Sequence, residues 1–98
     1  MDYTKIIEAI ESVQHPAINA SLTTLGILQD IDIEDGKVKG TLVWPFDLVP
    51  PQIKQFITNS IQNALKPFNL DFVYDERLMN DEEKEKFLAL EKANWKGF

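Results

Sequence analysis

Apolar residues recur every three or four positions over residues 53–68, which is the periodicity of an α-helix with one buried face. The stripe consists of Ile53, Phe56, Ile57, Ile61, Ala64, Leu65 and Phe68. Pro51 suits the first turn of this helix, where a missing N–H costs nothing, and Pro67 is expected to end it. The pattern predicts a central helix, preceded by a strand over residues 41–44 and a proline-rich loop over residues 45–51.

Residues 27–44 alternate between apolar and polar positions around an Asp35-Gly36 pair, which indicates a β-hairpin with a type I′ turn. In the first strand the isoleucines share one face. The other face is predicted to carry Leu28, Asp30, Asp32 and Glu34. In the returning strand the inner positions are Val38, Gly40, Leu42 and Trp44. Lys37 and Lys39 are expected to pair with the acids across the hairpin.

The remaining elements are two helices and one strand. A first helix is predicted over residues 2–13, with Tyr3, Ile6, Ile7, Ile10 and Val13 on its apolar face. Residues 15–25 form a connection from which Ile18, Leu22 and Leu25 enter the core. A third strand is predicted over residues 70–74, followed by a linker over residues 75–80.

A charged helix is predicted over residues 81–95, because Asn80 and Glu83 have the spacing of a capping box. Phe87, Leu88, Trp95 and Phe98 lie on one side of it, with Leu90 at the margin. We expect this helix to fold back onto the sheet or onto a neighbouring subunit. The alternative is that it docks in a groove of a partner.

The order helix, strand, strand, helix, strand predicts an α+β fold. Its sheet would be small, mixed and three-stranded, with both helices on one face, and a C-terminal helix would follow. A chain of 98 residues is expected to form one domain, with a core over residues 2–75 and a helical extension over residues 80–98.

Composition excludes several kinds of chemistry. There is no cysteine, so the chain supplies no disulfide, thiolate ligand or cysteine nucleophile. The net charge of −6 and the scattered lysines argue against nucleic-acid binding.

No apolar run reaches the roughly 18 residues of a membrane-spanning helix, and the N-terminus does not have the pattern of a signal peptide. A cytoplasmic protein is expected.

Catalytic and metal-binding patterns are weak. His15, the only histidine, precedes Pro16 and has no cysteine partner or evident serine nucleophile. A small enzyme using His15 is therefore the weakest hypothesis, and we expect no enzyme and no metal site. The acids at positions 30–35 lack a loop that would wrap a metal ion. Charges that protect an edge strand explain them better.

Apolar side chains flank or occupy the loop over residues 45–51. They are Trp44, Phe46, Leu48 and Val49. If they are exposed, they form a contact surface; if they turn inward, they cover the end of the sheet. The sequence leaves both possibilities open.

Several short stretches occur in a familiar order over residues 6–74. The helix IIEAIESV leads into His15-Pro16-Ala17, then Leu25-Gly26-Ile27-Leu28, the hairpin, LVWPF and the central helix. In this order the chain resembles the iron–sulfur cluster assembly domain family, which includes PaaD-like and SufT-like proteins and the N-terminal domain of Mrp-type carriers. The resemblance implies the fold above and a role in maturing iron–sulfur or related metal centres.

The chain also departs from the family pattern. Many members have a cysteine in the loop after the second strand, where this chain has PFDLVPP. His15 and Ala17 replace the acids of the usual Asp-Pro-Glu, and Thr24 replaces an acid before Leu-Gly. The resemblance therefore implies an accessory or adaptor protein that does not ligate a cluster by itself, with any cluster shared with a partner.

The implied binding surface consists of His15, Pro16, Thr24, Gly26, Trp44, Pro45, Phe46, Asp47 and Leu48. The implied partners are iron–sulfur assembly proteins or client apo-proteins. The alternative is a degenerate interaction or dimerisation module unrelated to metal. It would act as a homodimer or capture a partner through the C-terminal helix and an open sheet edge.

Overall fold

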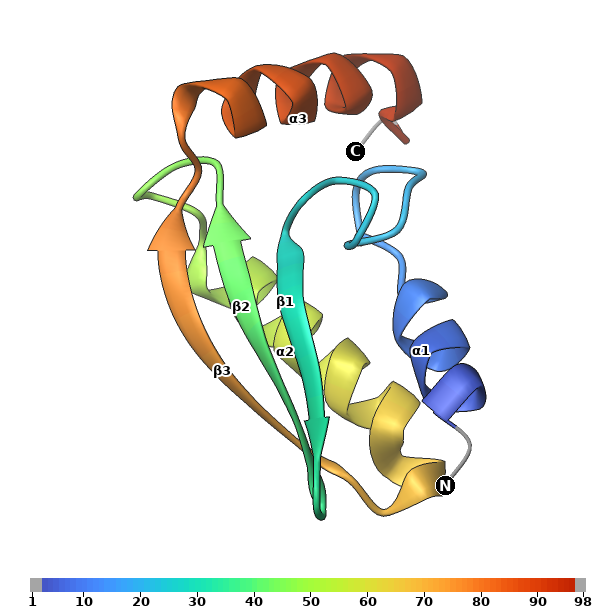
Figure 1. Cartoon of the computed structure of the whole chain (residues 1–98). Coiled ribbons are helices and arrows are strands. Elements are labelled where there is room, and N and C mark those ends of the chain that lie inside the picture. Colours follow the sequence, from blue (N-terminus) through green and yellow to red (C-terminus); the bar gives the residue numbers. More distant parts are fainter. Residues whose placement is uncertain (1–2, 97–98) are drawn as a thin grey trace.

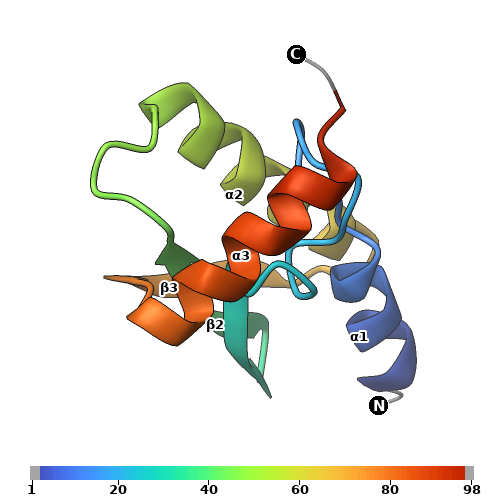
Figure 2. The same cartoon turned by 90° about the horizontal axis from the view of Figure 1, so that it is seen from above.

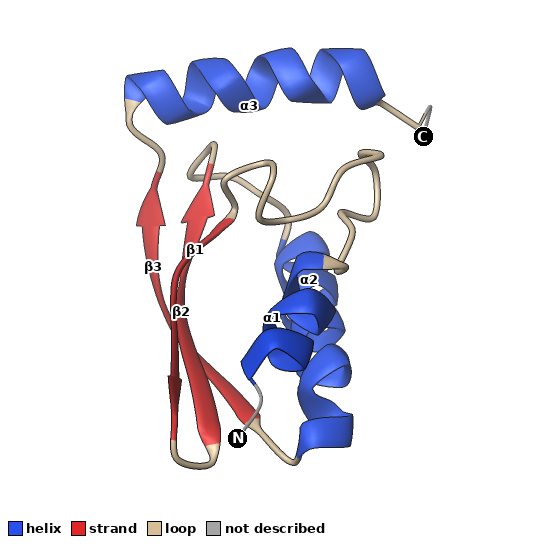
Figure 3. Ribbon diagram, turned by 45° about the vertical axis from the view of Figure 1, so that its right-hand side comes forward, coloured by secondary structure: helices blue, strands red, loops and turns tan. Residues whose placement is uncertain are grey.

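A computed structural model describes residues 3–96 of the chain. Its elements are α1 (Tyr3–Glu11), β1 (Leu28–Glu34), β2 (Lys37–Trp44), α2 (Pro51–Leu65), the 3-10 turn η1 (Lys66–Phe68), β3 (Asp71–Leu78) and α3 (Asp81–Asn94). The sheet order is β1-β2-β3, with β1 antiparallel and β3 parallel to β2. Both α1 and α2 lie on one face of the sheet, and α3 crosses its end (Figures 1 and 3). The predicted α+β fold is confirmed.

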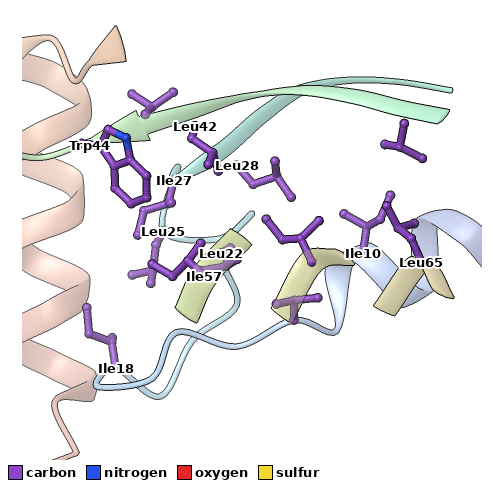
Figure 4. Close-up of a cluster of buried hydrophobic side chains, with 14 of the residues drawn as sticks. Ile10, Ile18, Leu22, Leu25, Ile27, Leu28, Leu42, Trp44, Ile57 and Leu65 are labelled. Atoms are coloured by element: carbon purple, nitrogen blue, oxygen red, sulfur yellow. The ribbon is translucent and has the colours of Figure 1, made fainter. Parts of the chain in front are cut away.

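The core lies between the sheet and the helices α1 and α2. Fully buried side chains come from α1 (Ile6, Ile10), from α2 (Ile57, Ile61, Leu65), from β2 (Val38, Leu42) and from the connection after α1 (Ile18, Leu22, Leu25). Figure 4 shows this cluster. Burying each such side chain contributes about 1.5–3 kcal/mol. The predicted stripes are confirmed except at their margins, where Tyr3 and Phe56 are about half exposed.

The strand β1 departs from its predicted alternation. Its ladder with β2 is irregular between Gln29 and Asp32, and Asp30 adopts a left-handed φ of +55° there. The extra residue of this bulge shifts the side-chain alternation by one. Leu28, predicted on the acidic face, therefore pairs with Leu42 and is buried.

Beyond the bulge the hairpin pairs as predicted. Asp32 lies opposite Lys39, and Glu34 lies opposite Lys37 with an ion pair of 3.4 Å. The predicted type I′ turn is wrong, since it requires positive φ at both central residues and only Gly36 has it. The carbonyl of Gly36 also accepts a hydrogen bond from the Asp71 N–H at 3.2 Å, so the turn is bonded to the start of β3 as well.

The strand β3 is longer than predicted. Residues 75–80 were expected to be a linker, but the ladder with β2 continues without interruption to Trp44 opposite Leu78. This part of the strand could not be predicted because residues 75–77 are charged, and their side chains are exposed at the edge of the sheet. A charged, exposed edge strand lacks the apolar alternation from which strands are recognised.

Glu83 joins α3 to the sheet. The predicted capping box is present, with hydrogen bonds of 2.8 and 3.0 Å between Asn80 and Glu83. The same carboxylate accepts two bonds from Arg77 of β3, at 2.8 and 2.9 Å, and one from Gln29 of β1, at 2.7 Å. The Arg77 hydrogen bond is the main reason that the pKa of Glu83 falls to about 2, and the Asn80 N–H and Gln29 add to it.

The predicted helix over residues 81–95 is confirmed as α3, but its apolar face differs from the prediction. Phe87 is buried, whereas Leu88 and Trp95 are 41% and 49% exposed. Leu90 packs partly buried against the core. Phe98 lies outside the described residues. None of the helices that the structure describes is long and apolar enough to cross a membrane.

Replacing Glu83 by alanine should lower the free energy of unfolding by about 2 kcal/mol, because one cap and the charged bonds to Arg77 are lost together. Glu83→Gln should cost about half as much, since its amide oxygen still accepts bonds. Urea denaturation near neutral pH measures both. Glu85→Ala, at an exposed α3 position, is the control and should stay within about 0.5 kcal/mol of wild type. Equal stabilities for the three variants would contradict this role of Glu83.

Candidate functional site

An apolar hollow of about 230 Å³ lies at the end of the sheet where β2 passes into α2. We call it the loop-end pocket. Its walls come from the segment after α1, the β2–α2 loop, the start of α2 and one side of α3, and they include His15, Trp44, Phe46, Leu48, Phe87 and Trp95. Figure 2 looks onto this end and shows α3 crossing it, with the β2–α2 loop reaching out beside it.

The apolar side chains of the β2–α2 loop divide into two groups. Trp44 is 3% exposed and covers the end of the sheet, with the ammonium of Lys54 5.1 Å from its ring centroid. Phe46 is 41% exposed, with Lys84 of α3 5.0 Å from its ring, and Leu48 is 91% exposed. The sequence left open whether these side chains are exposed or cover the end of the sheet. Trp44 covers it as a core residue, whereas Phe46 and Leu48 face solvent.

The prolines explain where this loop begins and ends. Pro45 follows the last pair of β2 and has no N–H with which to continue a ladder. Pro50 is the N-cap of α2, and Pro51 occupies the first helical position. The carbonyl of Pro50 accepts bonds from the N–H groups of Ile53 and Lys54, at 3.0 and 3.2 Å. The loop is thereby held between two fixed ends.

His15 is a buried member of the pocket wall. Its Nδ1 accepts a hydrogen bond from the Ala17 N–H at 2.9 Å, and its carbonyl accepts one from Lys96 Nζ at 3.4 Å. Burial, followed by the charge of Lys96, lowers the pKa of His15 from 6.5 to about 4. A neutral ring that accepts at Nδ1 carries its proton at Nε2. The imidazole is therefore uncharged near neutral pH.

The structure separates the predicted surface into two parts. His15, Trp44, Pro45, Phe46 and Leu48 meet at the loop-end pocket. Thr24 and Gly26 instead line a second hollow with Gln29 and with Glu83 and Lys86 of α3. Pro16 lies between His15 and Ala17, which both line the loop-end pocket, and Asp47 is exposed in the loop between Phe46 and Leu48.

The second hollow is shaped by the turn that enters β1. Ser21 Oγ donates to Thr24 Oγ1 at 2.8 Å, and the Thr24 N–H donates to Ser21 Oγ at 3.2 Å. Gly26 has a φ of +78°, which few residues other than glycine adopt. Its carbonyl accepts a bond from Gln29 Nε2 at 2.8 Å. Thr24 and Gly26 therefore have a clear structural role in positioning β1.

Sequence reasoning missed the contribution of α3 to the pocket. Phe87 and Glu91 line it from one side of α3, and Trp95 lines it from the position directly after the helix. Their spacing of four residues was the available signal, because such residues share a helical face. The sequence placed Phe87 and Trp95 on one side of this helix, but it did not indicate that Glu91 lies between them or that this side lines the pocket.

The donor atoms do not fit an iron–sulfur cluster. Clusters are held by cysteine thiolates, with histidine in some sites, and the chain has no cysteine. His15 already uses Nδ1 for the Ala17 N–H. Within residues 3–96, no three His, Asp or Glu side chains come together as a metal site.

The fold and the pocket define a small α+β domain with an apolar hollow at the loop end of its sheet. Residues 4–69, about two thirds of the chain, match the model of the iron-sulfur cluster assembly protein family. The chain belongs to this family, and its role lies in iron–sulfur cluster assembly. The matched segment extends from α1 through η1 and ends before β3. Comparisons with characterised proteins and with solved structures gave no significant match.

Acidification should destabilise the domain through His15. Below pH 6.5 the unfolded chain binds a proton at His15 that the folded chain excludes until about pH 4. The unfolded state is therefore favoured as the pH falls through this window, by an amount on the order of 3 kcal/mol.

The variant His15→Asn removes this titration, and its side-chain oxygen can still accept the Ala17 N–H. Urea denaturation across the same window should show a shallower loss of stability for the variant than for wild type. Parallel pH dependences would show that His15 does not titrate as described.

Proposed function

We propose that this chain is a non-enzymatic adaptor of cytoplasmic iron–sulfur cluster assembly, and that it holds a partner protein at the loop-end pocket. Family membership supports the general role. The adaptor function is supported chiefly by one observation, the exposed apolar rim of the pocket. Leu48 is 91% exposed, and Phe46 and Trp95 are about half exposed. Ordered apolar side chains that face solvent around a hollow are typical of a contact surface.

The volume of the pocket favours a protein side chain as its occupant. At about 230 Å³ it exceeds the roughly 150 Å³ of a cavity that holds benzene. It is smaller than the range that starts at about 300 Å³ for small-molecule sites. One aromatic or branched aliphatic side chain of a partner would fill it. Such a buried anchor surrounded by a rim is the usual arrangement of an interface hot spot.

The loop is suited to binding because little order has to be gained. Pro45, Pro50 and Pro51 fix its two ends. Phe46 is held against Lys84 of α3. Preorganised groups lose less conformational entropy on association, so more of the buried apolar area contributes to affinity.

In this proposal the cluster is cargo, and its ligands belong to the partner. The residues at the pocket supply no thiolate. The partner is therefore an assembly scaffold, a carrier or a client apo-protein with cysteines of its own. The adaptor would bring such proteins together without forming a bond to iron.

The test is an anaerobic affinity purification of the tagged full chain from its native cells, with partners identified by mass spectrometry and iron and sulfide assayed. Wild type should retain assembly proteins or apo-clients. The amount of partner protein retained by the double variant Phe46→Ser, Leu48→Ser should fall about tenfold, because the variant lacks the exposed apolar contacts. Trp44 is left unchanged, since truncating this buried ring would cost about 3–5 kcal/mol of stability.

Leu88→Ser is the matched control, because Leu88 is 41% exposed on α3. It should retain the partners of wild type. Thermal unfolding should show a cooperative transition for both variants. Undiminished capture by the double variant would exclude the pocket as the binding site. Partners unrelated to metal centres, with no iron in the complex, would instead favour an interaction module outside cluster assembly.

A further inference from the structure

The two edges of the sheet differ. At the β1 edge the ladder contains a bulge, Asp30 adopts positive φ, and Asp32 and Glu34 project from the strand. A bulge of this kind discourages pairing with another chain. The β3 edge also carries charged residues, but its ladder has no bulge. Its eight residues pair with β2 in continuous register, and no other strand within residues 3–96 pairs with its other side.

The backbone groups at the free edge can be assigned. The N–H groups of Asp71 and Met79 donate to Gly36 and Trp44, at 3.2 and 2.8 Å, so odd-numbered residues of β3 face β2. By the alternation of a strand, even-numbered residues direct their N–H and C=O groups away from β2.

Side chains already occupy both ends of this free edge. The N–H of Phe72 donates to Gln62 Oε1 at 2.9 Å, and the carbonyl of Leu78 accepts from Arg77 Nη1 at 3.2 Å. The groups of Tyr74 and Glu76 in the middle are directed to solvent. The edge is therefore closed at its ends and open at its centre.

Apolar side chains accompany this open centre. Tyr74 is 41% exposed and Leu78 51% exposed on the face that α1 and α2 cover elsewhere, and Val73 is 39% exposed on the opposite face. The rings of Phe72 and Tyr74 stack with centroids 5.3 Å apart. Pairing with another strand would remove apolar surface from water on both faces of the sheet.

We propose that β3 pairs antiparallel with β3 of a second copy of this chain, about a two-fold axis at Tyr74, to form a six-stranded sheet. The N–H of Tyr74 in each copy donates to the carbonyl of Tyr74 in the other copy, which provides two hydrogen bonds. The N–H of Glu76 donates to the carbonyl of Phe72 in the partner, which provides two more. None of these four requires Gln62 to release the Phe72 N–H. The proposal is independent of the loop-end pocket.

The charges along β3 favour one register of this pairing. With the axis at Tyr74, Asp71 of each copy lies opposite Arg77 of the other, whose guanidinium also binds Glu83 of its own chain, and no like charges are directly opposed. An axis at Val73 places Asp71 opposite Asp75. An axis at Asp75 or Glu76 places that acid opposite its own copy. Directly opposed like charges destabilise a strand pair, so the neighbouring registers are disfavoured.

Sedimentation velocity of the full chain over a dilution series tests the proposal. Wild type should show a reversible monomer–dimer equilibrium. Glu76→Pro should abolish the dimer and leave a folded monomer, because it removes an N–H that faces away from β2, and an edge strand tolerates proline at such a position. A wild-type chain that stays monomeric, or a dimer that survives Glu76→Pro, would overturn the proposal. So would a dimer that Leu48→Ser dissociates and Glu76→Pro does not.

Two equal charge changes on the same face of β3 test the register. Asp71→Arg places an arginine opposite Arg77 of the partner and should raise the dimer dissociation constant about tenfold. Asp75→Arg lies opposite Val73 and should change the constant by no more than about twofold. Circular dichroism spectra of both variants should match that of wild type. Equal effects, or a larger effect at position 75, would rule out the axis at Tyr74.

Discussion

Two hydrogen bonds at the end of β2 hold the chain on both sides of the end of the sheet where the loop-end pocket lies. The Val43 N–H donates to the carbonyl of Ile27 at 2.7 Å, just before β1 begins. The carbonyl of Trp44 accepts from the Met79 N–H at 2.8 Å, just after β3 ends. The chain that enters β1 and the chain that leaves β3 are therefore fixed to the same short stretch of backbone. Between them Trp44 is buried, although its Nε1 finds no hydrogen-bond partner among the described residues.

This arrangement explains why α3 becomes part of the site. Because Met79 is held at the end of β2, the capping box at Asn80 begins α3 directly over the end of the sheet, and Glu83 fixes its direction through Arg77 and Gln29. At its far end, the Asn94 carbonyl accepts from the Asn19 N–H at 2.8 Å. The pocket therefore combines residues of the matched family segment with a wall from the helix that follows it.

Features that depend on local sequence could be predicted, and features that depend on distant contacts could not. The helix α2, the hairpin and the capping box follow from periodicity and turn chemistry, which act within a few residues. The bulge at Asp30 and the full length of β3 depend on pairing with β2. At the site, the sequence located the loop over residues 45–51. Strand alternation placed Trp44 on the inner face, but the sequence could not tell whether Phe46 and Leu48 are exposed, because their exposure is set by how α2 and α3 pack around the loop.

The two proposed surfaces do not compete, because they use different backbone and different side chains. The loop-end pocket opens at the end of the sheet, whereas β3 presents its lateral edge. Antiparallel pairing about Tyr74 directs the two copies of β3 in opposite directions, so the pockets of a dimer lie at opposite ends of the six-stranded sheet. Each pocket then remains free to take its own partner. An adaptor built in this way would join two proteins through one continuous hydrogen-bonded sheet, and the distance between them would be set by the sheet and not by a flexible linker.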